Sequence, residues 1–590
     1  QEGDNIQVFQ ASPRKSSNVK RKIPNRETIV TLNHDFQKNN FMNKSKIFAF
    51  SAISLSAALL LTACGNSVSK SEDSAQEAKY SFASNILTLD TSMAADVNSI
   101  DVLLNVDAGL VRWNPKAQVV NDLAKSIDIS KDGKTYNVTL RDGLKWSNGA
   151  KLRAADFVYG WQRTVDPKTG SQYAYALTPV ANASEIMTGK KPVDTLGIKA
   201  ESDKKLVITL ATPTPYFNKL LTLPAYYPVN EAFVKKMGNK YGTSSDTSLY
   251  NGAFKFVKGK NNWTGSNETF SIVKNDQFYD AKNVKLSGAT YQIVNNPNTA
   301  VNLFKSGKLD VANLATPELV SANKKNKDYK ALTSPRIDVL EYNQSGKVPE
   351  LSNLKIRQAL NLATNRKNLL EIAAPSFSIT NTVTPKKLDQ APNGEDFATY
   401  AAQPYKYDAK KAAELFKEGL KELGKTSITL ELEGANDNSF AKAAVDYLKG
   451  NLEKDLPGLT INEKLVSSAQ RQKDAQNNNF QILLTSWGAD YNEPSDFLMN
   501  FVSGSTMNHG LVKNPNFDKA YQAATTAPDV LSADKRYAHY KDAENALYEA
   551  ANVNPLATES VSLLLNPKLK GISTYNSAMI FDLRHAEITK

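Results

Sequence analysis

The single cysteine of this 590-residue chain has the most distinctive chemical setting of any side chain. Cys64 follows Leu61-Thr62-Ala63, and an uncharged run over 47–61 lies behind the basic start Met42-Asn43-Lys44-Ser45-Lys46. This order is that of a secretory signal, and the apolar run is too short to span a bilayer comfortably. A lone thiol directly after it predicts lipid attachment at Cys64, which anchors the processed chain to a membrane without spanning it. The alternative is an ordinary buried cysteine after a short core helix.

A second motif, Gly419 to Thr426, matches the phosphate-loop formula G-x-x-x-x-G-K-[ST]. In nucleotide-binding proteins this loop follows a strand and opens a helix, so that backbone N–H groups face the phosphates. Here the order is reversed, because 410–423 has apolar residues at helical spacing and 427–432 alternates like a strand. Gly424 is therefore interpreted as a left-handed helix stop and not as part of a nucleotide site.

Other residues that could support catalysis do not form a known pattern. His509, His539 and His585 follow Cys64, and none has a partner at metal-ligand spacing. The sequence contains no G-x-S-x-G nucleophile motif, and its one thiol is assigned to lipid. The sequence therefore predicts a protein that is not an enzyme and needs no metal or cofactor, with a secreted hydrolase as the disfavoured alternative.

Length and charge restrict the class of protein further. The whole chain has a net charge of +12. Residues 1–41 contribute seven basic and four acidic side chains, and the signal contributes two lysines. Without these two segments, the part from Cys64 onward has a net charge of +7. This charge is modest for the length, and no basic stripe with interleaved aromatic residues suggests nucleic acid. More than 500 residues after Cys64 exceed what one hydrophobic core supports, so two or more lobes are expected.

The elements that must position any site are of mixed type. Strand patterns cover 135–140, 206–210 and 270–273, whereas 154–163 and 533–551 have helical spacing. Prolines are spread along the chain and no internal repeat is present. The sequence therefore predicts an α/β protein whose lobes are built from discontinuous segments.

Five runs in this order resemble the peptide-binding proteins of ABC importers. They are Leu87-Thr88-Leu89-Asp90, Lys145-Trp146-Ser147-Asn148-Gly149, Ala155-Asp156-Phe157-Val158-Tyr159-Gly160-Trp161-Gln162-Arg163, Tyr250-Asn251-Gly252-Ala253-Phe254 and Asn353-Leu354-Lys355-Ile356-Arg357-Gln358-Ala359-Leu360. Asn148 stands where the family usually has Asp. These residues are expected to be structural: Trp146 and Trp161 bury rings, Gly149 permits a turn, and Asp156 caps a helix.

The resemblance implies a two-lobed α/β fold like that of periplasmic binding proteins, with an extra subdomain inserted in the first lobe and a hinge between the lobes. The implied organisation is an upstream extension at 1–41, a lipoprotein signal at 42–63, a tether at 64–79, the first lobe at 80–113 and 236–340, the inserted subdomain at 114–235, the second lobe at 341–558, and a return to the first lobe at 559–590. Implied partners are oligopeptides, the permease subunits of an importer, and the outer face of the cell membrane through Cys64.

The resemblance also implies where the ligand binds. Trp487-Gly488-Ala489-Asp490-Tyr491 follows the apolar run 480–484, a predicted buried strand, and ligand sites of α/β proteins gather where strands end. Asp490 takes the place of the carboxylate that pairs with the peptide's α-ammonium. The backbone at Ser486 and Gly488 is expected to pair with an extended peptide. Three further residues are expected to line the site: Trp487, Ala489 and Tyr491. Val102 is expected to offer strand pairing from the other lobe. Asp490 as a turn or helix cap is the alternative.

Two questions stay open at this point. Some relatives bind the peptide's C-terminal carboxylate with a basic residue three positions before the tryptophan, and this chain has Leu484 at that position. Because Leu484 cannot bind a carboxylate, we hypothesise that the ligands are longer peptides whose C-terminus is not held. The same fold also hosts receptors for signalling peptides, nickel, heme or sugars. His509 is expected on the surface as a lone histidine.

Overall fold

The computed structural model describes residues 76–574 and 581–590, so the predicted signal and Cys64 lie outside the described residues. Within the described part, every helix is too short or too polar to traverse a bilayer. Two lobes with separate hydrophobic cores make up this part. One core is built around β1, α2 and β8–β10, and the other lies between β14–β16 and helices α9, α12 and α13.

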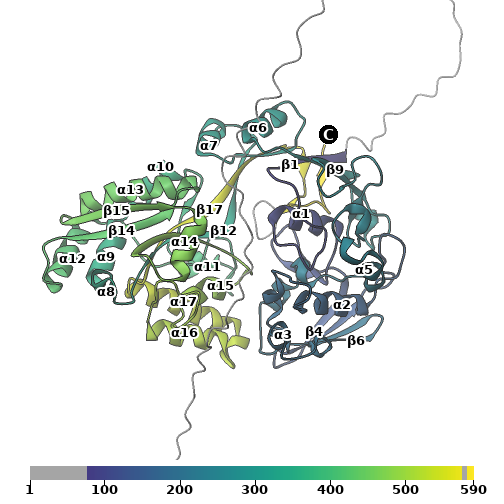
Figure 1. Ribbon diagram of the computed structural model, residues 1–590, viewed down its shortest axis with the longest axis horizontal. Helices are drawn as coiled ribbons and strands as arrows, with labels where there is room; N and C mark the ends of the chain where they lie inside the picture. Colours follow the sequence, from purple (N-terminus) through teal and green to yellow (C-terminus); the bar gives the residue numbers. More distant parts are fainter. Residues whose placement is uncertain (1–75, 575–580) are drawn as a thin grey trace, which may run out of the picture. The chain divides into compact units, whose positions relative to one another are not determined.

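Two long strands connect the lobes. β12 (Tyr329–Tyr342) and β17 (Val553–Leu565) are antiparallel neighbours, and Figure 1 shows them running side by side between the two groups of elements. β17 pairs with β11 (Val311–Asn313) at one end, while β12 pairs with β16 (Ile482–Gly488) at the other. Their register shifts between Thr333 and Ile337, so residues 334–336 interrupt the ladder. Such an interruption bends a strand pair, and it lies between the lobes, where the resemblance implies a hinge.

The first lobe contains a four-stranded sheet in the order β1-β10-β9-β8. Its strands are β1 (Glu77–Phe82), β8 (Phe254–Phe256), β9 (Thr269–Lys274) and β10 (Gly288–Ile293). β1 runs parallel to β10 from Glu77 onward, and the side chain of Gln76 donates to the carbonyl of Ile588. The predicted tether over 64–79 is therefore too long at its end, because residues 76–79 already belong to the folded lobe.

A second four-stranded sheet, β4-β5-β7-β6, forms inside the segment 114–235. It comprises β4 (Ala124–Ile129), β5 (Thr135–Leu140), β6 (Ile198–Ser202) and β7 (Lys205–Thr209), with α2 (Ala154–Val165) packed beside it. Trp146 and Trp161 are fully buried, Gly149 has φ +86°, and the Asp156 carboxylate accepts the N–H of Arg153 at the helix start. The structural roles predicted for these four positions are confirmed.

The second lobe is built on β16, β14 (Ile428–Ala435) and β15 (Leu459–Val466), in this order. Helices α9 (Leu354–Ala363), α12 (Ala409–Glu422) and α13 (Ser439–Asp455) pack on this sheet, and α16 (Pro515–Thr525) pairs with α17 (Ala533–Glu549). α12 ends before Gly424, whose φ is +66°, and β14 follows at once. The reading of the phosphate-loop match as a helix stop is confirmed, because no helix begins at this glycine.

The remaining elements are short or cover the sheets. They are α1 (Val97–Val106), β2 (Val111–Trp113), β3 (Val119–Asn121), α3 (Ala183–Met187), α4 (Phe217–Leu220), α5 (Glu231–Met237), α6 (Pro297–Lys305), α7 (Pro317–Asn323), α8 (Pro349–Ser352), α10 (Arg366–Ala373), β13 (Ser378–Ile379), α11 (Phe397–Tyr400), α14 (Ser468–Gln476), α15 (Pro494–Leu498), β18 (Leu569–Lys570), β19 (Ser573–Thr574), β20 (Phe581–Asp582) and β21 (Glu587–Ile588).

Candidate ligand-binding site

A pocket of about 370 Å³ lies where the lobes and the connecting strands meet. The first lobe contributes Ala95, residues of α1 and Tyr173, the connection contributes 334–336, and the second lobe contributes 488–490. Asp490 and Arg336 both line this pocket and carry opposite charges. A charged ligand held here would contact both lobes and residues 334–336 at once.

Asp490 is an exposed carboxylate within this pocket, with one side-chain partner among the described residues. The hydroxyl of Tyr175, from the inserted subdomain, donates to its Oδ1 at 3.1 Å. Surrounding protein removes water and raises the pKa of Asp490 above its ordinary value, an effect that the Tyr175 hydrogen bond partly opposes. The group is therefore short of donors, which favours a ligand that brings a positive charge.

The turn that follows β16 is capped by a different carboxylate. Asp496 is buried and accepts the backbone N–H groups of Asp490, at 2.7 Å, and Tyr491, at 3.2 Å. Burial raises the pKa of Asp496 well above its ordinary value, and the charge of Asp490 raises it further. The cap role proposed as the alternative for Asp490 thus belongs to Asp496, and the Asp490 side chain is left for other contacts.

One edge of β16 is open beside the pocket. β16 pairs with β12 from Ile482 to Gly488, but β14 pairs with it only at Ile482 and Leu483. The N–H of Ala489 donates to the carbonyl of Pro335, which fixes the alternation of the antiparallel ladder. By that alternation the backbone groups of Ser486 and Gly488 point away from β12, toward the open edge. These are the two positions at which the sequence predicts pairing with an extended ligand.

The predicted strand over 480–484 is corrected by this pairing. β16 begins at Ile482, two residues later than predicted, and runs on through Trp487 and Gly488, so Asp490 stands two residues beyond the strand end. Trp487 is half-buried, its indole N–H donates to Glu341 at 2.9 Å, and its ring stacks on His509 with centroids 5.2 Å apart. The expectation of a surface histidine at 509 is wrong, because this stacking buries the imidazole, and burial lowers its pKa.

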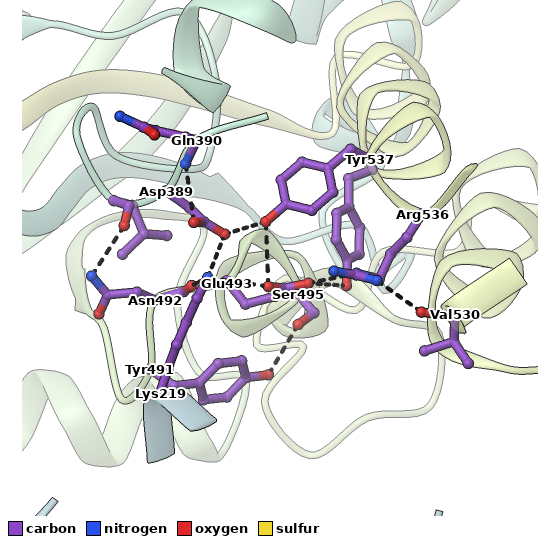
Figure 2. A network of polar contacts seen from close by, with 12 residues as sticks. Lys219, Asp389, Gln390, Tyr491, Asn492, Glu493, Ser495, Val530, Arg536 and Tyr537 are labelled. Atoms are coloured by element: carbon purple, nitrogen blue, oxygen red, sulfur yellow. Dashed lines mark hydrogen bonds and ion pairs between the residues drawn. The ribbon is translucent and has the colours of Figure 1, made fainter. Parts of the chain in front are cut away.

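Tyr491 contacts the inserted subdomain and not the pocket itself. Its ring stacks on Tyr216 with centroids 4.1 Å apart and an interplanar angle of 7°. Beside this pair lies an interlobe ion cluster, made of Lys219 from the inserted subdomain and of Asp389, Glu493, Arg536 and Tyr537 from the second lobe (Figure 2).

In the interlobe ion cluster, Lys219 Nζ lies 2.8 Å from Asp389 and 3.5 Å from Glu493. Arg536 pairs with Glu493 from the other side at 2.9 Å, and Figure 2 shows both cations converging on this carboxylate. The Lys219 amine also donates to the carbonyl of Asn492, and the Tyr537 hydroxyl to Asp389. Burial raises the pKa of Asp389, although the charge of Lys219 opposes the shift. The cluster ties the two lobes together three residues from Asp490.

The prediction that Val102 offers strand pairing is wrong. It lies inside helix α1 with its side chain fully buried, so it has no strand edge to offer. Asp96 caps this helix by accepting the N–H of Ser99. Neighbouring residues of α1, such as Ile100 and Leu104, line the pocket instead and give it an apolar wall.

Among the described residues, no group of His, Cys, Asp and Glu side chains has the geometry of a metal site.

Comparison with known proteins identifies the family of this chain. Residues 118–509 match the model of the bacterial extracellular solute-binding proteins, family 5. The chain belongs to this family. The dipeptide-binding protein of Lactococcus lactis subsp. cremoris is 46% identical over 554 residues, which cover 93% of this chain and 100% of that protein. The oligopeptide-binding protein OppA of Bacillus subtilis is 30% identical over 87% of this chain and 94% of its own length.

Solved structures establish the two-lobed fold. OppA of Listeria monocytogenes bound to peptide has a TM-score of 0.66 at 31% identity, covering 87% of this chain and 99% of that one. The unliganded open form of the periplasmic murein tripeptide-binding protein MppA has a TM-score of 0.75 at 26% identity, covering 87% and 98%. The predicted family and the predicted fold are both confirmed.

Proposed function

We propose that this protein is an extracytoplasmic receptor that binds oligopeptides between its lobes and delivers them to the permease of an ABC importer, without chemistry of its own. The observation that carries the proposal is a donor-poor carboxylate, Asp490, two residues beyond the open edge of β16 in a pocket that both lobes line. The lobe boundaries given above, with the first lobe beginning at Gln76, belong to the same proposal.

The arrangement suits ligands that share a backbone but differ in side chains. Every peptide has amides that can pair with a strand edge, here at Ser486 and Gly488, and an unmodified peptide has an α-ammonium for Asp490. A charged hydrogen bond to a carboxylate is stronger than a neutral one and requires the ammonium. Relatives named as dipeptide-binding and oligopeptide-binding proteins support this ligand class.

Lipid anchoring at Cys64 completes the proposal, since a receptor that hands its ligand to a membrane permease must stay close to it. Substitution of Cys64 by serine in the full chain should abolish the incorporation of labelled fatty acid that the unchanged protein shows. Equal labelling of the two proteins, or no labelling of the unchanged one, would contradict the anchor.

A receptor for one signalling peptide is the second candidate. It is favoured by the similarity to the pheromone receptor PrgZ, which is 34% identical over 87% of this chain and has a TM-score of 0.67. Mass spectrometry of ligands that co-purify with a form beginning after Cys64 separates the two. Peptides of mixed sequence support general uptake, a single peptide supports signalling, and non-peptide ligands alone would refute both.

A further inference from the structure

We infer that Arg336 is the second charged group of this site, and that it binds the C-terminal carboxylate of peptides two or three residues long. The inference rests on the proposed function, because it needs the peptide's amino terminus at Asp490. It assigns the role of carboxylate reader to the connecting strand β12. The position at which some relatives carry that reader is Leu484, which is buried here and uncharged.

Arg336 has a free face toward the pocket. Its side chain is 45% exposed and lines the pocket together with Asp490. Nε lies 3.4 Å from Glu559, and Nη2 donates to the Ser486 hydroxyl at 3.1 Å. Among the described residues no acceptor is found for Nη1. A guanidinium has five N–H donors in a fixed fork, so these contacts leave donors for a second carboxylate.

Gly488 determines where this guanidinium lies. Arg336 and Gly488 are direct partners in the β12–β16 pairing, and a Cβ added at Gly488 would stand 2.5 Å from Nη1. The absence of a side chain therefore lets the guanidinium cross over the strand beside the open edge. The positive charge thus lies directly next to the backbone groups that are free to pair with a ligand.

The spacing of the two charges limits the ligand's length. Gly488 and Asp490 are two residues apart, so their Cα atoms are separated by at most about 7 Å. An extended peptide covers about 3.3–3.6 Å per residue, which places the termini of a dipeptide about 7 Å apart and those of a tripeptide about 10 Å apart. A peptide with its ammonium at Asp490 that pairs back along β16 toward Ser486 brings its carboxylate to Arg336 at this length. A longer peptide places an uncharged amide there.

Glu559 and the buried Asp338 are the competing carboxylates near Arg336, and of the two Glu559 makes the direct contact. It accepts the Ser486 hydroxyl at 2.6 Å and contacts Arg336 only through Nε, so it holds one edge of the guanidinium in place. Its own side chain is 22% exposed, half the exposure of Arg336. Glu559 therefore orients the guanidinium through Nε, and Nη1 has no acceptor among the described residues.

The test uses calorimetric titration of the protein that begins after Cys64. The probes are the dipeptide Ala-Leu, its C-terminal amide, its N-acetyl form and a hexapeptide of Ala and Leu. For the unchanged protein we expect amidation to weaken dipeptide binding at least tenfold. In Arg336→Gln the acid and the amide should bind within twofold of each other, while the loss caused by N-acetylation should remain. Arg153→Gln, which removes an exposed arginine paired with Asp203, should keep both effects.

The outcomes separate this inference from the proposed function. Equal binding of acid and amide by the unchanged protein, or binding of the hexapeptide without the dipeptides, would overturn the role of Arg336 and leave peptide binding intact. Failure of every peptide to bind would refute the proposed function itself. A merely structural role of Arg336 would lower all affinities or the melting temperature together and would leave the preference for the acid unchanged, which also overturns the inference.

Discussion

Replacement of Asp490 by asparagine tests the contact on which the proposed function depends. Asparagine keeps the size and one acceptor oxygen but removes the charge, so the Tyr175 hydroxyl still has a partner. Two unit charges 4 Å apart attract by about 1 kcal/mol in water and about 4 kcal/mol at the effective dielectric constant of a protein surface. Truncating one partner of a buried hydrogen-bonded charge pair costs about 2–5 kcal/mol. We therefore expect Asp490→Asn to weaken binding of a free-amine peptide by roughly 30-fold to several thousand-fold.

The assay is a double cycle measured by calorimetric titration. It compares the unchanged protein and Asp490→Asn, each with a free-amine peptide and with its N-acetyl form. Acetylation should weaken binding strongly in the first protein and little in the second. Asp203→Asn, an exposed carboxylate in the inserted subdomain, should behave like the unchanged protein. A coupling below about 0.5 kcal/mol between the two changes is indistinguishable from additivity and would refute the contact.

The pH dependence of the same affinity provides an independent check. Loss of water raises the pKa of Asp490 in the free protein, and a bound ammonium lowers it again. Binding therefore releases a proton at low pH, and affinity falls as the pH drops through the raised pKa. The loss should begin at a higher pH than for an ordinary aspartate and should be absent from Asp490→Asn. An affinity in the unchanged protein that is constant down to pH 4 would contradict the assignment.

Two further predictions concern stability and spectroscopy. Lys219→Met leaves Asp389 and Glu493 with one cation fewer between them and should lower the free energy of unfolding by about 2–4 kcal/mol in denaturant titrations. This loss is somewhat below the usual cost of breaking a buried ion pair, because Arg536 still pairs with Glu493. An unchanged denaturation midpoint would contradict the prediction. Burial raises the pKa of Glu341 to about 7, so the stability it contributes is complete below about pH 4.5 and decreases, by at most about 3 kcal/mol, as the pH rises through 7. The emission of its hydrogen-bonded partner, Trp487, should change over the same range in the unchanged protein but not in Glu341→Gln.

Local patterns in the sequence were sufficient to predict the helices and strands that are determined by their own residues. The alternating run at 135–140 coincides with β5, and the helical spacing at 410–423 lies one residue from the bounds of α12. Gly424 was interpretable because the order of helix and strand around it follows from periodicity alone. The strand predicted at 480–484 starts two residues too early and ends four residues too early, since its last residues, Trp487 and Gly488, are held by pairing with β12 and not by an apolar pattern.

The site was predictable only where it is continuous in the sequence. Asp490 lies in a conspicuous block, whereas Tyr175 and Arg336 come from segments 315 and 154 residues away and meet it through tertiary structure. No local pattern gives the register of β12 on β16, which alone places Arg336 opposite Gly488. Val102 failed for a different reason: Asp96 followed by a run with apolar residues at helical spacing predicts a capped helix, and the expectation of a strand overrode that signal.

In the proposed function, the position of the site would let a small ligand influence the angle between the lobes. Residues 334–336 leave the β12–β17 ladder, yet Arg336 remains paired with Gly488 and Pro335 accepts the N–H of Ala489. The hinge and the open edge of β16 are thus adjacent backbone segments joined by hydrogen bonds. A peptide that pairs with this edge and contacts α1 of the first lobe spans the hinge directly, so its contacts favour whichever lobe angle satisfies both sides. Because the interlobe ion cluster joins the lobes three residues further on, a change of lobe angle in the proposed function would turn about this region and keep it intact.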